Sequence, residues 1–149
     1  MEIRFAENKD IYAIIDLCKA HTAYEKADYN AENKAESLEK LLFATDSVLK
    51  CLVVEADKEI VGYATFTKQV STWDADYYIY LDCLFIQEHA RGNGIGKQIM
   101  FAIKDYACSV GCSAVQWQTP DFNKRAIKFY KELGATSKTK ERFSWKFDL

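Results

Sequence analysis

The chain has few of the features that mark membrane, nucleic-acid-binding or disulfide-bonded proteins. Its 20 basic and 22 acidic residues leave a formal charge of −2, and because the basic residues are scattered we expect no nucleic-acid partner. It has no apolar run of transmembrane length and no signal-peptide pattern, so we expect a cytoplasmic protein without membrane contact. The five cysteines are odd in number and form no C-x-x-C pair, which favours free thiols.

Other absences bear on domain structure and metal binding. The single proline is Pro120, and no repeat, low-complexity tract or linker interrupts the sequence. A length of 149 residues with 49% hydrophobic content suits one compact domain, so we predict a single domain over residues 1–149. Cys108 and Cys112 can share a helix face, but no histidine lies near them in the sequence, so no metal site is predicted.

Hydrophobic periodicity predicts a mixed α+β fold. Strands are expected at 2–6, 49–56, 60–70, 77–86, 113–119 and 142–147, with a turn at Asp57-Lys58 between the second and third. Helices are expected from an Asn8 cap to about residue 25, at 35–43, from the glycine-rich loop to Gly111, and at 123–133. The strand–loop–helix–strand passage from 77 to 119 is a parallel crossover, while the other strands favour antiparallel pairing.

The hexapeptide RGNGIG at residues 91–96 is the most informative segment. Glycines allow positive φ and close approach of the backbone, and the helix that follows directs unpaired N–H groups into the same space. Such a loop can be only a tight turn, but its place between a strand and a helix favours a phosphate or pyrophosphate cradle. It does not fit a P-loop, because Arg91 stands at the first glycine position and Gln98 at the hydroxyl position. A dinucleotide fingerprint also fails for lack of a third glycine.

The loop does fit the pattern [QR]-x-x-G-x-[GA], with Arg91, Gly94 and Gly96 at the defined positions. Two further segments occur in the matching order, YLDCLFI before the loop and NKRAIKFYKELGA after it. In these segments the chain resembles the GNAT superfamily of N-acetyltransferases. The Y-L-[DE]-x-L-F-[VI] strand, Tyr24-Glu25, and the acidic loop that carries Trp73 are most similar to the spermidine/spermine (diamine) N-acetyltransferase branch.

This resemblance implies a mostly antiparallel GNAT sheet flanked by helices, with a β-α-β core that binds acetyl-CoA. It also implies direct attack by the acceptor amine in a ternary complex, in which proximity and orientation lower much of the barrier. Backbone groups of Leu84 to Ile86 would hold the pantetheine arm and polarise the thioester carbonyl. The implied cofactor-binding residues are Leu84, Phe85, Ile86, Arg91, Gly92, Asn93, Gly94, Ile95, Gly96, Lys97, Asn123 and Tyr130.

Two residues are candidates for catalysis. Tyr130 would protonate the leaving thiolate as a general acid, although its place on an amphipathic helix also suits a core aromatic. Asp82 interrupts an apolar strand, where an ionised group needs a reason. It would anchor or deprotonate the incoming ammonium, or serve as a structural carboxylate where strands diverge. Asn123 could hold coenzyme A or cap the helix that follows it.

The acceptor site is expected to use acidic and aromatic side chains, which attract a cationic amine. The candidates are Tyr24, Glu25, Trp73, Asp74 and Asp82, with Asp28 and Asp76 nearby, and each of the acids could equally be a solvated surface residue. Cys83 is not expected to be a nucleophile, because no histidine is near it in the sequence. His89 is expected to be a surface residue.

The sequence therefore predicts an acetyl-CoA-dependent N-acetyltransferase for a small primary amine, such as a diamine or polyamine. The alternatives are acetylation of a peptide or protein N-terminus or lysine, and a non-catalytic acyl-CoA-binding protein. By resemblance a homodimer is expected, with the last strand around Trp145 as a contact.

Overall fold

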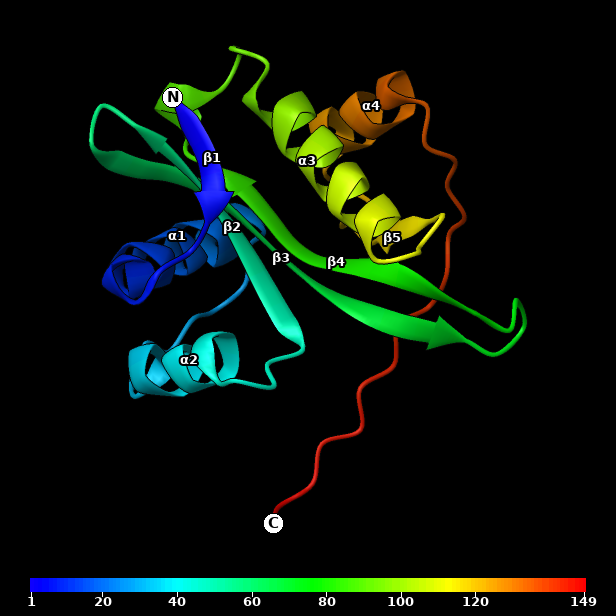
Figure 1. Cartoon of the computed structure of the whole chain (residues 1–149), viewed down its shortest axis with the longest axis horizontal. Coiled ribbons are helices and arrows are strands. Elements are labelled where there is room, and N and C mark those ends of the chain that lie inside the picture. The colour runs from blue at the N-terminus through cyan, green and yellow to red at the C-terminus, as the bar shows by residue number, and fades with distance from the viewer. The chain divides into compact units, whose positions relative to one another are not determined.

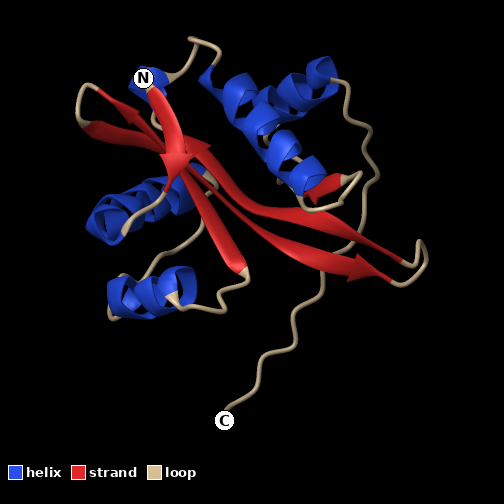
Figure 2. Cartoon of the chain, viewed as in Figure 1, coloured by secondary structure: helices blue, strands red, loops and turns tan.

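The computed structural model describes all residues, 1–149, and the chain forms two compact units, Met1–Gln118 and Thr119–Leu149. The first unit is built on a five-stranded sheet with strand order β1-β2-β3-β4-β5 (Figures 1 and 2). The strands are β1 (Glu2–Phe5), β2 (Leu49–Ala56), β3 (Glu59–Ser71), β4 (Asp76–Ile86) and β5 (Val115–Trp117). All neighbours pair antiparallel except β4 and β5, which are parallel, so the predicted mixed, mostly antiparallel sheet is confirmed.

Helices cover both faces of this sheet (Figure 1). Helices α1 (Ile11–Tyr24) and α2 (Lys34–Phe43) lie on one face, and α3 (Ile95–Ser109) lies on the other. Short 3-10 turns, η1 (Asn8–Asp10) and η2 (Glu88–Ala90), precede α1 and the glycine loop. The apolar residues of α1 and α2 pack with those of β2–β4 in one core, which includes Ile14, Leu17, Leu42, Val53 and Tyr63.

Local sequence signals set most of these boundaries. Asp57 and Lys58 both adopt positive φ, 50° and 66°, in the tight turn that joins β2 to β3. Gly111 (φ 79°) follows α3 as predicted. The predicted Asn8 cap is wrong, because Asn8 begins η1 and the first turn is closed at Asp10, whose carboxylate accepts a hydrogen bond from Glu7 N at 2.8 Å.

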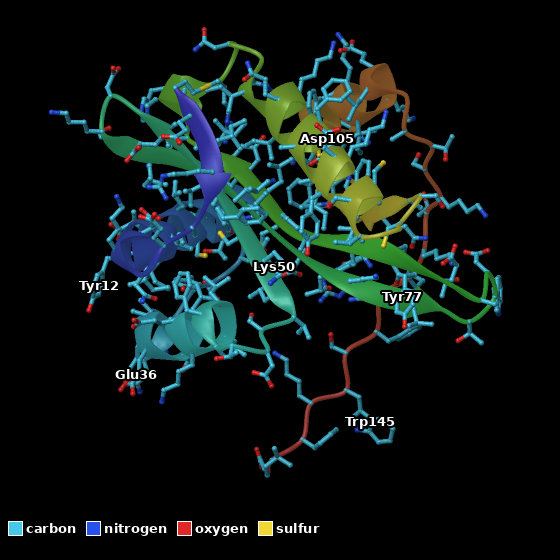
Figure 3. The ribbon with its side chains drawn as sticks, in the orientation of Figure 1. Tyr12, Glu36, Lys50, Tyr77, Asp105 and Trp145 are labelled. Atoms are coloured by element: carbon cyan, nitrogen blue, oxygen red, sulfur yellow. The ribbon has the colours of Figure 1, made fainter.

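The second unit contains α4 (Lys124–Leu133) followed by an extended chain. Asn123 caps α4, since its side chain accepts a hydrogen bond from Ala126 N at 3.2 Å, and Gly134 ends it at φ 103°. The predicted strand at 142–147 is absent, because a strand needs a neighbour for its backbone groups and this unit contains no other strand. Trp145 is 90% exposed there, and Figure 3 shows its side chain on the extended chain.

Candidate active site

The glycine loop takes the backbone conformations that its sequence predicts. Gly92 and Gly94 adopt φ of 86° and 74°, and Gly94 is the N-cap of α3. Gly96 differs, because it already lies inside α3 and needs no positive φ. The first intrahelical bond of α3 runs from Gln98 N to Gly94 O at 3.1 Å, so the amides that precede Gln98 have no carbonyl of the helix to pair with.

Arg91 connects the glycine loop to β4 and to the end of α1. Its Nε donates to Ile86 O at 2.8 Å, at the end of β4. Its guanidinium carbon lies 4.7 Å from the ring centroid of Tyr24 and 5.3 Å from that of Phe85. Such contacts are cation–π interactions, and they join the end of α1 to the start of the glycine loop. Tyr24 and Arg91, predicted for acceptor and cofactor respectively, therefore lie side by side.

Strand β4 loses its partner on one edge where the predicted site begins. β5 pairs only with Ile79–Leu81. From residue 83 to residue 86, β4 is paired with β3 alone. An extended ligand with its own amide groups can add to such an edge like another strand. Leu84, Phe85 and Ile86 lie on this segment.

Asp82 lies where β4 and β5 diverge. The register of β3 and β4 shifts at this point, so that Thr65 faces Cys83, Phe66 faces Leu81, and Asp82 has no partner across the ladder. A bulge of this kind redirects a side chain, and Asp82 is exposed. The premise that its carboxylate sits in an apolar setting is therefore wrong. Its Oδ2 accepts a hydrogen bond from Cys83 Sγ at 3.7 Å.

A polar network behind Asp82 was missed at the sequence level. His21, on the last turns of α1, lies with its Nδ1 2.9 Å from the hydroxyl of Tyr63 on β3, and its Nε2 contacts Glu25 Oε2. Cys83, the neighbour of Asp82, lies on β4, the strand that pairs with β3. His21 and Glu25 are four residues apart on a helix, a spacing that brings side chains together and could have drawn attention to the pair.

Burial keeps the inner members of this network protonated. Tyr63 is 2% exposed, and desolvation raises its pKa far above the ordinary value. Desolvation likewise raises the pKa of Cys83 to about 11 and that of Cys18 above its usual range. At neutral pH Cys83 is therefore a thiol, which agrees with the expectation that it is not a nucleophile.

The predicted acceptor residues fall into two groups in the structure. Glu25 contacts His21, and Tyr24 packs near Phe85, with their ring centroids 6.2 Å apart. Trp73 and Asp74 lie at the tip of the β3–β4 hairpin. Trp73 is 98% exposed, and Asp74 Oδ2 accepts a hydrogen bond from Ser71 Oγ at 2.9 Å. The six residue-to-residue steps along β4 from Asp76 to Asp82 span roughly 20 Å. The structure therefore does not bring Trp73 and Asp74 together with Asp82.

The remaining predicted residues belong to the second unit. Tyr130 is half-buried on α4, with its ring 5.3 Å from that of Phe129. Asn123 is engaged as the N-cap of the same helix, as one of the two sequence interpretations proposed.

The fold and these residues together are those of a known class of acyltransferase. The family described as "Acetyltransferase (GNAT) family" matches residues 10–135. The chain belongs to this family and is an N-acetyltransferase, like its named relatives.

Individual relatives and a solved structure give a more specific comparison than the family does. The chain is 33% identical over 145 residues to the thialysine N-epsilon-acetyltransferase of Bos taurus, a match that covers 92% of this chain and 85% of the relative. It is 24% identical to human spermidine/spermine N(1)-acetyltransferase-like protein 1, across 94% of this chain and 21% of that protein. The solved structure of the aminoglycoside N-acetyltransferase AAC(6')-Iy in complex with CoA has a TM-score of 0.80 at 20% identity, covering 97% of this chain and 93% of that one.

Two further features concern membranes and metals. No helix of the structure combines the length and apolar character needed to cross a bilayer. No group of three or more His, Cys, Asp or Glu side chains is arranged to hold a metal ion. The absence of a metal cofactor stays a prediction.

Proposed function

We propose that the protein transfers the acetyl group of acetyl-CoA to the primary amine of a small, cationic molecule by direct attack in a ternary complex. The observation that carries this proposal is the open edge of β4 from residue 82 to residue 86, directly before the loop that begins α3. One continuous stretch of backbone thus offers a strand edge for an amide-bearing arm and a helix N-terminus for a pyrophosphate.

Coenzyme A has the parts that fit both places. The pyrophosphate would lie over residues 91–97, where the positive end of the α3 dipole and the Lys97 ammonium favour negative charge. The pantetheine arm would pair with the backbone of residues 84–86, which brings the thioester toward Asp82. A solved relative that holds CoA shares the fold and supports this assignment.

The acceptor side is acidic and aromatic. Asp82 is exposed beside the predicted thioester position, Glu25 is partly exposed, and Tyr24 is 42% exposed near Phe85. Carboxylates attract an ammonium group and aromatic faces accept it. Relatives named for thialysine, D-amino acids and L-ornithine support a small amine as acceptor. Tyr130 is proposed as the general acid that protonates the coenzyme A thiolate.

The test is turnover of acetyl-CoA with a panel of acceptors, followed by thiol release and by the mass of the product. The panel holds thialysine, L-ornithine, putrescine, spermidine, a D-amino acid, and peptides with a free N-terminus or lysine. A small amine acetylated far faster than any peptide is the expected result. Preference for a peptide would replace the proposed acceptor. Binding of acetyl-CoA without turnover of any amine would indicate a non-catalytic acyl-CoA-binding protein.

Assembly and location complete the proposal. We propose a cytoplasmic homodimer whose contact includes residues 142–147. Phe143, Trp145 and Phe147 alternate along this segment at 90%, 90% and 73% exposure, so one apolar face of an extended chain is open to solvent. Light scattering of the wild type and of Trp145→Ser tests this, since a wild-type monomer would contradict it.

A further inference from the structure

We propose that Tyr24 is a positioning residue for the cofactor, because its ring holds the side chain of Arg91 and thereby fixes the start of the glycine loop. The inference rests on the proposed function, in which this loop receives the pyrophosphate of coenzyme A. It gives Tyr24, which the sequence assigns to the acceptor, a role on the cofactor side of the site.

The glycine loop has few contacts of its own with the rest of the protein. Gly92, Asn93 and Gly94 are exposed, whereas Ala90 before them and Ile95 after them are buried. A Cβ added at Gly92 or Gly94 would meet no atom within 4 Å, so the space beside these two backbone positions is open. The position of residues 92–94 therefore depends on what holds the loop at its two ends.

The two ends of the loop are held in different ways. At the far end, Ile95 is 5% exposed and begins α3. At the near end the connection is the side chain of Arg91, whose Nε donates to Ile86 O at 2.8 Å. Its guanidinium carbon lies 4.7 Å from the ring centroid of Tyr24 and 5.3 Å from that of Phe85. No ion pair of the structure includes Arg91, so one carbonyl group and two aromatic rings hold its charged end.

The two rings that hold Arg91 have different surroundings. Phe85 is 7% exposed and belongs to the core between the sheet and α1, where His21 stacks on it with 5.1 Å between ring centroids. Tyr24 is 42% exposed at the last position of α1. A change at Phe85 would disturb the core, whereas a change at Tyr24 removes the outer contact of the guanidinium. Tyr24 is therefore the position at which this contact can be tested in a folded protein.

The contact bears on cofactor affinity through the order of the loop. A guanidinium is attracted to the face of an aromatic ring, and this attraction restricts a long side chain that would otherwise sample many rotamers. A loop that is already ordered binds its ligand more tightly, because ordering it is no longer a cost of binding. The attraction comes from the ring and not from the hydroxyl group. We therefore expect the aromatic ring of Tyr24 to strengthen the binding of coenzyme A.

Three variants test this inference. Tyr24→Leu removes the ring, Tyr24→Phe keeps the ring and removes only the hydroxyl, and Tyr12→Leu makes the first change near the other end of α1, where Tyr12 is 75% exposed. Calorimetric titration with coenzyme A in the absence of any acceptor isolates the cofactor role. We expect binding about fivefold weaker for Tyr24→Leu and unchanged for the other two. At saturating acceptor, the KM of Tyr24→Leu for acetyl-CoA should rise by the same factor while kcat stays within about twofold.

A double-variant cycle tests whether Tyr24 acts through Arg91. Arg91→Met keeps a long side chain without its charge and should weaken the binding of coenzyme A by itself. Tyr24→Leu should then weaken it no further, because the contact is already lost. Tyr24→Gln, which also lacks the ring, replaces Tyr24→Leu if that variant does not fold.

The possible outcomes separate this inference from the proposed function. Wild-type affinity in Tyr24→Leu, an equal loss in Tyr24→Phe, or additive losses in the double variant would overturn the positioning role. A wild type that does not bind coenzyme A would instead overturn the proposed function.

Discussion

The first unit of the protein contains two regions in which carboxylates are tied to basic side chains, and they are organised in opposite ways. Asp10 is 4% exposed, and its oxygens lie 2.7 and 3.0 Å from the two terminal nitrogens of Arg4. Asp82 is exposed beside the thiol of Cys83, and Glu25 is partly exposed against the imidazole of His21. A carboxylate whose partners are all inside the protein holds one charge permanently, which suits a structural role. A carboxylate that reaches solvent can still bind a cationic ligand.

The largest expected effect tests the general acid that is proposed to protonate the leaving thiolate. Tyr130→Phe should lower kcat by roughly 10²–10⁴-fold and leave the KM for acetyl-CoA nearly unchanged, because the hydroxyl acts on the thiolate only in the transition state. Steady-state kinetics across pH provide the measurement. Phe129→Leu, a change on the neighbouring ring, controls for packing of α4. A Tyr130→Phe rate within twofold of the wild type would mean that another group protonates the sulfur.

The next effect tests Asp82, the exposed carboxylate of β4. Asp82→Asn keeps the shape of the side chain but removes its charge and basicity, so kcat/KM for a cationic amine should fall by roughly 10²-fold at pH 7. Part of the loss should be recovered at high pH, where more of the amine is neutral. The comparison predicts little change in thermal stability, because Asp82 is exposed. Reduced stability with an unaltered pH–rate profile would mean that Asp82 is structural.

The opposite result, a loss of stability without a loss of activity, is expected for the buried carboxylate of Asp10. Asp10→Asn leaves Arg4 with only the longer contact to Glu55 Oε1, at 3.6 Å, and should lower the free energy of unfolding by about 3 kcal/mol, while kcat per folded molecule is unchanged. The hydrogen bond from Arg4 lowers the pKa of Asp10. Its contribution to stability is therefore complete above the unfolded pKa of about 3.9 and is lost as pH falls through the lower folded pKa. Urea unfolding from pH 7 to pH 2 should show the wild type and variant converging in acid, and a constant gap would contradict this.

The features that the sequence predicted correctly are set by neighbouring residues. The β2–β3 hairpin, the positive φ of Gly92 and Gly94, and the end of α4 at Gly134 each depend on a few adjacent positions. The order of elements and the spacing of the glycine motif were therefore enough to predict the fold and the family.

The features that were missed depend on contacts between distant residues. His21 and Tyr63 are 42 positions apart, and neither pattern nor spacing relates them. The exposure of Asp82 follows from a register shift between β3 and β4, which the apolar sequence around it conceals. Residues 142–147 alternate like a strand, but a strand forms only where a partner offers backbone groups.

The smallest expected effect separates ligand binding from backbone strain at the two ends of α3. Gly94 and Gly111 adopt φ of 74° and 79°, and a Cβ added at either would meet no atom within 4 Å. Valine should therefore strain both positions by a similar amount, of order 1–3 kcal/mol, and lower Tm alike. Only Gly94 lies in the proposed pyrophosphate cradle. Calorimetric titration should show acetyl-CoA binding about tenfold weaker for Gly94→Val and unchanged for Gly111→Val. Equal affinities in the two folded variants would remove the cofactor from this loop, and Asp82 would then no longer lie beside the proposed position of the thioester.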